Sequence, residues 1–252
     1  ILISGYYGFA NAGDEAMLTA IIESLRQVEK NVELTVLSGN PEDTAAKHQV
    51  CSVYRFNPLG IIQAMKDSEL IISGGGSLLQ DVTSKRSLLY YLSIIGLGKF
   101  FGKKVMLFAQ GIGPIRAKWA RKLTSLVCNE ADLITVRDSE SAAELIEMGV
   151  KPEKITVTAD SVLSLNPVTK ECGQYLLQEA GVDLTKPVIG ISVRPWSGDS
   201  QCFQVLAEAA SKLQQRYGAQ LILLPLQYSV DVKACENCLL YTSPSPRDPK
   251  TS

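Results

Sequence analysis

Residues 1–18, ILISGYYGFANAGDEAML, pass from the pattern of a strand to that of a helix through a loop with three glycines. The apolar run 1–4 predicts a strand, and residues 14–30 predict a helix whose apolar stripe extends to Val28. Glycines at such a junction let backbone N–H groups approach a ligand, and the helix N-terminus adds partial positive charge. Asp14 opens this helix, so it is either a first-turn residue or a carboxylate of a site.

Short β-branched runs alternate with helical stretches in the same way further along the chain. Strands are predicted at 32–38, 70–73, 104–110, 132–137 and 154–159, and a helix at 139–149, with Ser139 as its N-cap and Gly149 as its stop. Apolar strands separated by helices favour a parallel sheet that is covered on both faces. We therefore predict an α/β fold with a doubly wound, Rossmann-like domain over residues 1–165.

The pattern restarts after a linker and helix over residues 166–186. A strand at 188–196, a helix at 200–217 and a strand at 220–227 predict the start of a second α/β domain, 187–237. Because this domain has two predicted strands where the first has about six, we expect it to be truncated.

Residues 238–252, CLLYTSPSPRDPKTS, lack apolar periodicity. Reverse translation of residues 238–248 gives a string that resembles a transposase-based sequencing adapter. We therefore expect an artefactual tail here, with a natural Ser/Pro-rich tail as the alternative. The C-x-x-C pair formed by Cys235 and Cys238 is then not expected to be a redox or zinc motif.

The composition excludes several classes of protein. The chain has 252 residues and a formal net charge of −1, which gives no broad electrostatic reason to bind nucleic acid or an anionic membrane. Its longest apolar run, 88–98, is about half of the ~20 residues of a membrane span, so it predicts a buried helix, with a membrane-leaning surface as the alternative. Scattered cysteines favour reduced thiols. We expect a cytoplasmic protein without a transmembrane segment, and peripheral contact with the inner face of the membrane stays open.

Two further loops follow predicted strands. Residues 73–81 supply Gly74, Gly75, Gly76, Ser77, Gln80 and Asp81, and residues 108–114 supply Gln110 and Gly111. Because the carboxyl ends of parallel strands share one edge of the sheet, we expect these loops to meet the loop that contains Asn11 and Gly13. The side chains of Gln80 and Asp81 suit sugar hydroxyls, whereas a tight turn is the alternative explanation for the three consecutive glycines.

Three charged residues also follow predicted strands. Arg137 is suited to hold a carboxylate or phosphate, or to support a helix cap through Asp138. Asp160 ends the sixth predicted strand, with a structural role as the alternative. Arg194 follows the first strand of the second domain, where we expect it to bind an anion rather than to pack on Trp196.

The common nucleotide and metal sites are not predicted. The spacing of Gly5, Gly8 and Gly13 fits neither G-x-G-x-x-G nor a Walker A motif, and no acidic residue ends the second strand. The single histidine, His48, is expected at the surface, and there is no cluster of cysteines, so neither a zinc site nor a Ser-His-Asp triad is expected. We expect no metal and no cofactor.

In chain order, ILISGYYGFANAGDEAML, LIISGGGSLLQD, FAQGIGP, TVRDSES, TADSV and ISVRPW resemble the motifs of bacterial polysaccharide pyruvyl transferases, from residue 1 to about 232. The resemblance implies a glycosyltransferase-B-like fold with a cleft between two α/β domains. It implies transfer of a pyruvyl group from phosphoenolpyruvate to a sugar as a ketal, with release of phosphate. The implied acceptor is a lipid-linked or polymeric cell-wall saccharide, of the kind that anchors surface-layer proteins.

The resemblance also suggests roles for residues. Asp14 is expected to orient or deprotonate the acceptor hydroxyl, and Arg194 to hold the donor anion. The other residues expected to bind substrate are Asn11, Gly13, Gly74 to Ser77, Gln80, Asp81, Gln110, Gly111, Arg137 and Asp160. The family's general acid looks to be a histidine of the second domain that nothing here matches, so we expect the chain as written to be inactive.

Three other functions remain open at this point. The first is a glycosyltransferase of the same architecture that uses a nucleotide-sugar donor, and the second is a non-catalytic sugar-binding module. The third is a nicotinamide oxidoreductase, which the glycine spacing disfavours.

Overall fold

The structure is a computed structural model that describes residues 1–194 and 200–242. The chain divides after Leu165 into two compact units. Pro195 and Trp196 of the ISVRPW motif, and residues 243–252 of the expected artefactual tail, lie outside the described residues.

The first unit is built on a sheet of seven parallel strands in the order β3-β2-β1-β4-β5-β6-β7. The strands are β1 (Leu2–Tyr7), β2 (Thr35–Ser38), β3 (Cys51–Tyr54), β4 (Leu70–Gly74), β5 (Lys104–Gln110), β6 (Leu133–Val136) and β7 (Ile155–Val157). Ile3 on the central strand β1 pairs with Val36 on one side and with Ile72 on the other. The chain first builds the sheet outward from β1 to β3 and then returns to β4, so the order reverses between β1 and β4, where such sheets bind ligands.

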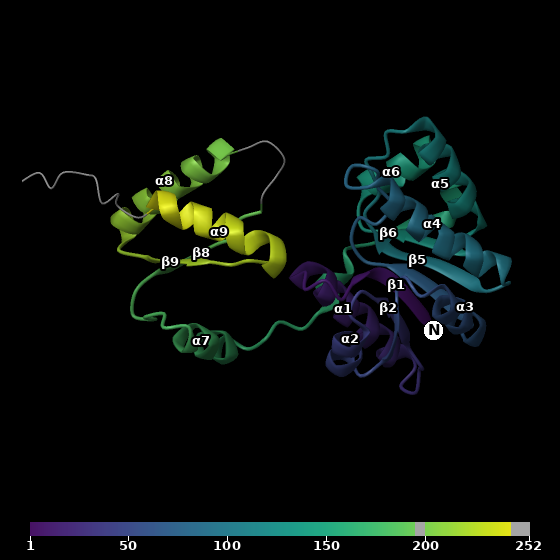
Figure 1. Ribbon diagram of the computed structural model, residues 1–252, viewed down its shortest axis with the longest axis horizontal. Helices are drawn as coiled ribbons and strands as arrows, with labels where there is room; N and C mark the ends of the chain where they lie inside the picture. The colour runs from purple at the N-terminus through teal and green to yellow at the C-terminus, as the bar shows by residue number, and fades with distance from the viewer. Residues whose placement is uncertain (195–199, 243–252) are drawn as a thin grey trace, which may run out of the picture. The chain divides into compact units, whose positions relative to one another are not determined.

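Helices cover both faces of this sheet (Figure 1). They are α1 (Ala12–Val28), α2 (Pro41–His48), α3 (Pro58–Asp67), α4 (Lys85–Phe100), α5 (Lys118–Glu130) and α6 (Ser139–Glu147), with short 3₁₀ helices η1 (Pro152–Lys154) and η2 (Ser161–Ser164). Leu2 belongs to the buried cluster that contains residues of α3 to α6, whereas the next residue, Ile3, belongs to the cluster that contains residues of α1. This alternation is the two-residue period of a strand, and it confirms the predicted doubly wound sheet.

Several local predictions need correction. The strand β3, Cys51–Tyr54, was not predicted, because four residues of mixed polarity carry a weak pattern. Val28 does not continue the apolar stripe of α1, since it is 88% exposed at the last position of the helix. The N-cap of α6 is Asp138 rather than Ser139, because the Asp138 carboxylate accepts a hydrogen bond from the Ser141 N–H.

Two other local predictions are confirmed. Gly149 follows α6 with φ +95°, a conformation that glycine adopts without strain. The apolar run 88–98 lies in α4, where Leu88, Leu92 and Ile95 are buried. In the part of the chain that the structure describes, no helix has both the length and the apolar character of a membrane span.

The second unit contains α7 (Lys170–Glu179), β8 (Val188–Ile191), α8 (Ser200–Tyr217), β9 (Gln220–Leu223) and α9 (Tyr228–Thr242). The strands β8 and β9 are parallel, with Val188 opposite Gln220, which confirms the predicted strand–helix–strand unit. Its small core includes Val193, Ala207 and Cys238. The helix α9 continues to Thr242, so the first residues of the segment 238–252 are helical.

Candidate functional site

The glycine loop after β4 is tied to the ends of β1 and β5. The Tyr7 hydroxyl donates a 2.6 Å hydrogen bond to the carbonyl oxygen of Gly74, and burial, followed by the nearby charge of Asp14, raises the pKa of Tyr7 well above its usual value. The Gly111 N–H donates to the carbonyl oxygen of Gly76 over 3.0 Å. Three loops that are far apart in sequence therefore meet at one edge of the sheet, as predicted for parallel strands.

Asp14 lies at this edge, in the first turn of α1. The side chain of Asn11 caps the helix by accepting a 3.0 Å hydrogen bond from the Gly13 N–H. A Cβ atom added to Gly76 would lie 3.2 Å from Oδ1 of Asp14. The carboxylate of Asp14 is thus placed directly beside the glycine loop, where a larger residue would crowd it.

Arg137 links the same loops to the ends of β6 and β7. Its Nη2 donates to Oγ of Ser77 over 3.2 Å, and its Nη1 lies 3.3 Å from Oδ2 of Asp160. Its Nε lies 3.3 Å from the carboxylate of Asp138, which also caps α6. The structure thus confirms that Arg137 supports the helix cap through Asp138, while the binding of a carboxylate or phosphate by Arg137 stays a prediction. Hydrogen bonds from Ser141, and then from Arg137, lower the pKa of Asp138.

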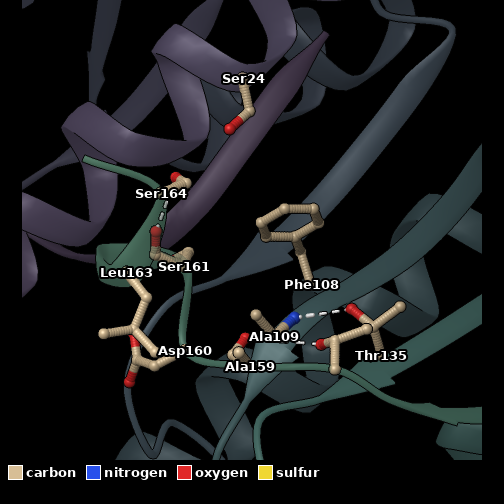
Figure 2. A pocket seen from close by; sticks show the side chains of 10 residues that line it. Ser24, Phe108, Ala109, Thr135, Ala159, Asp160, Ser161, Leu163 and Ser164 are labelled. Carbon is tan, nitrogen blue, oxygen red and sulfur yellow. Dashed lines mark hydrogen bonds between the residues drawn. The ribbon is translucent and has the colours of Figure 1, made fainter. Parts of the chain in front are cut away.

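A cavity of about 390 Å³ opens beside Asp160 (Figure 2). Phe108 and Thr135 line it from the sheet, and Ser24 lines it from α1. Ala109 has φ +48°, and its N–H donates a 2.7 Å hydrogen bond to Oγ1 of Thr135, drawn as a dashed line in Figure 2. The walls are mostly apolar, so this cavity suits the less polar part of a ligand held at the edge of the sheet.

Three of the predicted site residues brace the loops. Nε2 of Gln110 donates to the carbonyl oxygen and the hydroxyl of Ser73, both at 2.8 Å, and Gln110 is fully buried. Gln80 exchanges two hydrogen bonds with Thr83. The carboxylate of Asp81 accepts hydrogen bonds from the backbone N–H groups of Arg116 and Ala117, just before α5. The N–H of Ala117 in particular lowers the pKa of Asp81. These side chains hold the shape of the loops around the site.

Arg194 belongs to the second unit, at the carboxyl end of β8. Its Nη2 donates to Oε1 of Gln227 over 2.7 Å, and its Nη1 lies 3.8 Å from the buried carboxylate of Asp231. Half of its side chain remains exposed. The guanidinium of Arg194 is therefore held in place by Gln227 and Asp231 and is still partly accessible to a ligand.

The structure also contains arrangements that the sequence did not predict. His48 is not an ordinary surface residue: its side chain is 9% exposed, and its Nε2 lies 3.5 Å from Oε2 of Glu15. The other carboxylate oxygen of Glu15 accepts a 2.8 Å hydrogen bond from the Gly8 N–H. Arg55 is buried among aromatic side chains that include Phe9 of the first glycine loop. Only contacts between distant segments reveal these residues, since no local pattern marks them.

The residues that the structure describes contain no group of three or more His, Cys, Asp and Glu side chains arranged to hold a metal ion. The charged groups at the edge of the sheet include the guanidinium of Arg137 and the carboxylates of Asp14, Asp138 and Asp160. This set suits the binding and deprotonation of hydroxyl groups.

A family model described as polysaccharide pyruvyl transferase matches residues 11–251. No curated protein gives a significant match. Similar solved structures include Anabaena HepE in complex with UDP-glucose (14% identity, TM-score 0.60), a UDP-GlcNAc 2-epimerase from Neisseria meningitidis bound to UDP-GlcNAc (13%, 0.59) and a glycosyltransferase from Rickettsia africae (13%, 0.57).

The alignments to these three structures cover 98%, 96% and 96% of this chain, and 66%, 71% and 62% of theirs. The chain thus spans just under two thirds of the length of the HepE structure. At such low identity the likeness shows the fold alone, and it confirms the predicted α/β fold of the glycosyltransferase-B-like class.

Proposed function

Because the chain belongs to the polysaccharide pyruvyl transferase family, we propose that the whole protein transfers a pyruvyl group from phosphoenolpyruvate to a sugar of a cell-wall polysaccharide precursor. The observation that carries this proposal is the meeting of Asp14, the glycine loop at Gly76 and the Arg137 guanidinium at one edge of the sheet. Such an edge offers a carboxylate for a hydroxyl group, at the place where sheets of this kind bind their ligands.

The reaction forms a ketal from two sugar hydroxyls. A proton adds to the methylene carbon of phosphoenolpyruvate, and the resulting cationic carbon is attacked by the first hydroxyl oxygen. Loss of phosphate from the same carbon allows the second hydroxyl oxygen to close the ring. Of the two hydroxyl protons, one balances the proton taken up by the new methyl group and the other leaves with phosphate.

Asp14 is proposed to accept a proton from an attacking hydroxyl. The helix dipole favours a carboxylate in the first turn of a helix, and here that carboxylate lies beside Gly76. The loop formed by Gly74, Gly75, Gly76 and Ser77 is proposed to contact the acceptor sugar. Asn11 and Gly13 fix the start of α1 and so fix the position of Asp14.

Arg194 is proposed to hold the carboxylate or phosphate of the donor. Its contacts with Gln227 and Asp231 orient the guanidinium, and its exposed half leaves N–H groups for a ligand. Arg137, with its neighbours Asp138 and Asp160, is proposed to position the glycine loops and to contact the acceptor. No residue of this chain is assigned as the general acid.

The proposed acceptor is lipid-linked or polymeric, and the proposed location is the cytoplasm, at the inner face of the membrane. Anchoring of surface-layer proteins would be the use of the pyruvylated polymer. We propose phosphoenolpyruvate as a substrate and no separate cofactor.

A nucleotide-sugar-dependent glycosyltransferase is the second candidate, since several structures with this fold are described as complexes with UDP or UDP-sugars. The two candidates differ in the donor that they bind. The match of the polysaccharide pyruvyl transferase family model to residues 11–251 favours the pyruvyl transferase.

The deciding experiment measures phosphate release from phosphoenolpyruvate by the whole protein, with a lipid-linked N-acetylmannosaminyl saccharide as acceptor. We expect release that depends on the acceptor and that the Asp14→Asn variant reduces by about 100-fold or more, as for loss of a general base. Acceptor modification from a UDP-sugar, with no phosphate release from phosphoenolpyruvate, would establish the second candidate instead.

A further inference from the structure

Arg55 is a buried cation that no carboxylate pairs with among the described residues. Its side chain follows β3 and is 4% exposed. The guanidinium donates 3.3 Å hydrogen bonds to the carbonyl oxygen of Gly5 and to the Tyr91 hydroxyl, and its Nε is buried with no hydrogen-bond partner in that part of the chain. A buried charge without a counterion is costly, because neither water nor an anion compensates for it.

Aromatic rings surround the guanidinium. Its Cζ lies 4.4 Å from the ring centroid of Tyr90 and between 5.2 and 6.0 Å from the centroids of Tyr6, Phe9, Phe56 and Tyr91. Ring faces attract a cation, but each contributes much less than an ion pair in a dry site. The surroundings therefore hold Arg55 in place and still leave its charge available to an anion.

A cavity of about 260 Å³ lies beside Arg55, between α3 and α4. Arg55 and Tyr90 line it together with apolar side chains, among them Ile62, Ile94 and Leu97. The Tyr90 hydroxyl is buried near Ser4 and Arg55 without a well-formed hydrogen bond to either, and burial raises its pKa to about 12. A cavity with a cationic group and apolar walls fits an anion that is carried on an apolar chain.

The surface around this cavity has the character of a membrane contact. Phe56 is exposed just before α3 and Leu59 in its first turn, and Leu97 and Phe100 are exposed one turn apart on α4. Lys66 follows Ile62 by one turn on α3 and is exposed; its carbonyl oxygen accepts a hydrogen bond from Nζ of Lys103. Exposed apolar side chains flanked by lysines favour an anionic bilayer.

We propose that the cavity between α3 and α4 binds the phosphate head group of a membrane lipid at Arg55 and Tyr90, while the lipid chain passes Leu97 and Phe56 into the bilayer. A lipid is favoured over a soluble anion because the walls are apolar. It is favoured over a protein partner because the charge requiring compensation lies inside the cavity, and because exposed apolar side chains surround it.

The cavity lies close to the candidate functional site. Tyr91 accepts the hydrogen bond from Arg55, and its pKa is raised mainly by burial, with a lowering by Arg55 and a further raising by Asp14. The guanidinium of Arg55 also donates to the carbonyl oxygen of Gly5 on β1 and lies 5.3 Å from the ring of Phe9, in the loop that leads to Asp14. If the proposed function holds, a lipid in this cavity would bring the sugar that it carries to the glycine loops.

The test is flotation of the whole protein with phosphatidylcholine vesicles, with and without phosphatidylglycerol. We expect partitioning that phosphatidylglycerol strengthens, and a loss of at least ten-fold in the Leu97→Glu variant. Leu126→Glu is the matched control, because Leu126 is an exposed leucine on α5. Equal partitioning of the protein and its Leu97→Glu variant would overturn the proposal, and so would equal partitioning to both kinds of vesicle.

Arg55→Gln separates the head-group contact from the apolar rim. We expect this variant to retain weak vesicle binding but to lose the preference for phosphatidylglycerol, and Arg55→Lys to retain part of that preference. Circular dichroism identifies any variant that fails to fold. If the Arg55 variants fail to fold, vesicle partitioning of the protein and of its Leu97→Glu variant decides whether the proposal holds. Vesicle binding does not depend on catalysis, so its failure is distinguishable from a failure of phosphate release.

Discussion

Nη2 of Arg137 lies 3.2 Å from Oγ of Ser77, although the two residues are 60 positions apart in the sequence. This contact joins the loop after β4 to the end of β6. It follows from the strand order, in which β4, β5 and β6 are neighbours with their carboxyl ends at one edge. The proposed activity requires that the loops after β4 and β6 lie side by side, and the contact between Arg137 and Ser77 depends on that arrangement.

Replacement of Arg137 by lysine tests this arrangement. Lysine keeps the charge but cannot contact Ser77, Asp138 and Asp160 at the same time, so we expect phosphate release to fall by about 10- to 100-fold. Arg116→Lys is the control, since Arg116 is exposed and uses its backbone N–H in the contact with Asp81. Steady-state rates that stay the same in both variants would remove Arg137 from the site.

Gly76→Ala tests the space beside Asp14. Gly76 has φ +65°, so alanine is strained there, and its Cβ would lie 3.2 Å from Oδ1 of Asp14. We expect a loss of about 1 kcal/mol in the free energy of unfolding and a clear loss of acceptor-dependent activity.

Gly102→Ala separates the two effects of that change. Gly102 has φ +69° but nothing within 4 Å of an added Cβ, so we expect a similar loss of stability without a loss of activity. Denaturant unfolding and phosphate release measured on both variants check the prediction. Loss of activity in Gly102→Ala as well would show that backbone strain alone accounts for the effect.

Arg194→Ala tests the proposed donor contact. Removal of an exposed guanidinium that binds an anion should weaken the affinity for phosphoenolpyruvate by about 10- to 100-fold, which corresponds to the loss of one charge-assisted hydrogen bond or two. Isothermal titration calorimetry of the whole protein measures this change. Arg216→Ala in α8 is the control in the same unit, and an unchanged affinity in Arg194→Ala would contradict the role.

Asp81→Asn tests the brace of the loop between β5 and α5. The folded-state pKa of Asp81 is lowered, chiefly by the Ala117 N–H, so its ionised form stabilises the protein above the unfolded-state pKa of about 4, and this contribution is lost as the pH falls through the folded-state pKa. We expect the variant to be less stable by about 1 kcal/mol at pH 7.

The same difference in stability should shrink as the pH falls below about 4, because Asp81 then becomes uncharged in the parent protein as well. Urea unfolding at several pH values measures it. Asp67→Asn, at an exposed position whose carboxylate accepts hydrogen bonds from Gln63, should show little difference at any pH. A stability difference between the parent protein and the Asp81→Asn variant that is constant with pH would rule out the ionic contribution.

Much of the fold could be predicted from local patterns. Apolar runs marked six of the seven strands of the sheet, and the glycines after β1, β4 and β5 marked the loops at its carboxyl edge. The strand β3 was missed because its four residues, CSVY, are of mixed polarity, so no apolar run distinguishes them. The burial of the His48 side chain was missed because nothing adjacent in sequence indicates its contact with Glu15.

The sequence alone determined where six strands of the sheet, the helices between them and the glycine loops occur, because hydrophobic period and backbone freedom act over a few residues. Only the tertiary structure decided which side chains meet. Arg137 reaches Ser77, Gln110 turns inward to Ser73, and Arg55 lies among five aromatic rings, all through the order and register of the strands. Those depend on burial and hydrogen bonding between distant segments, which no local pattern records.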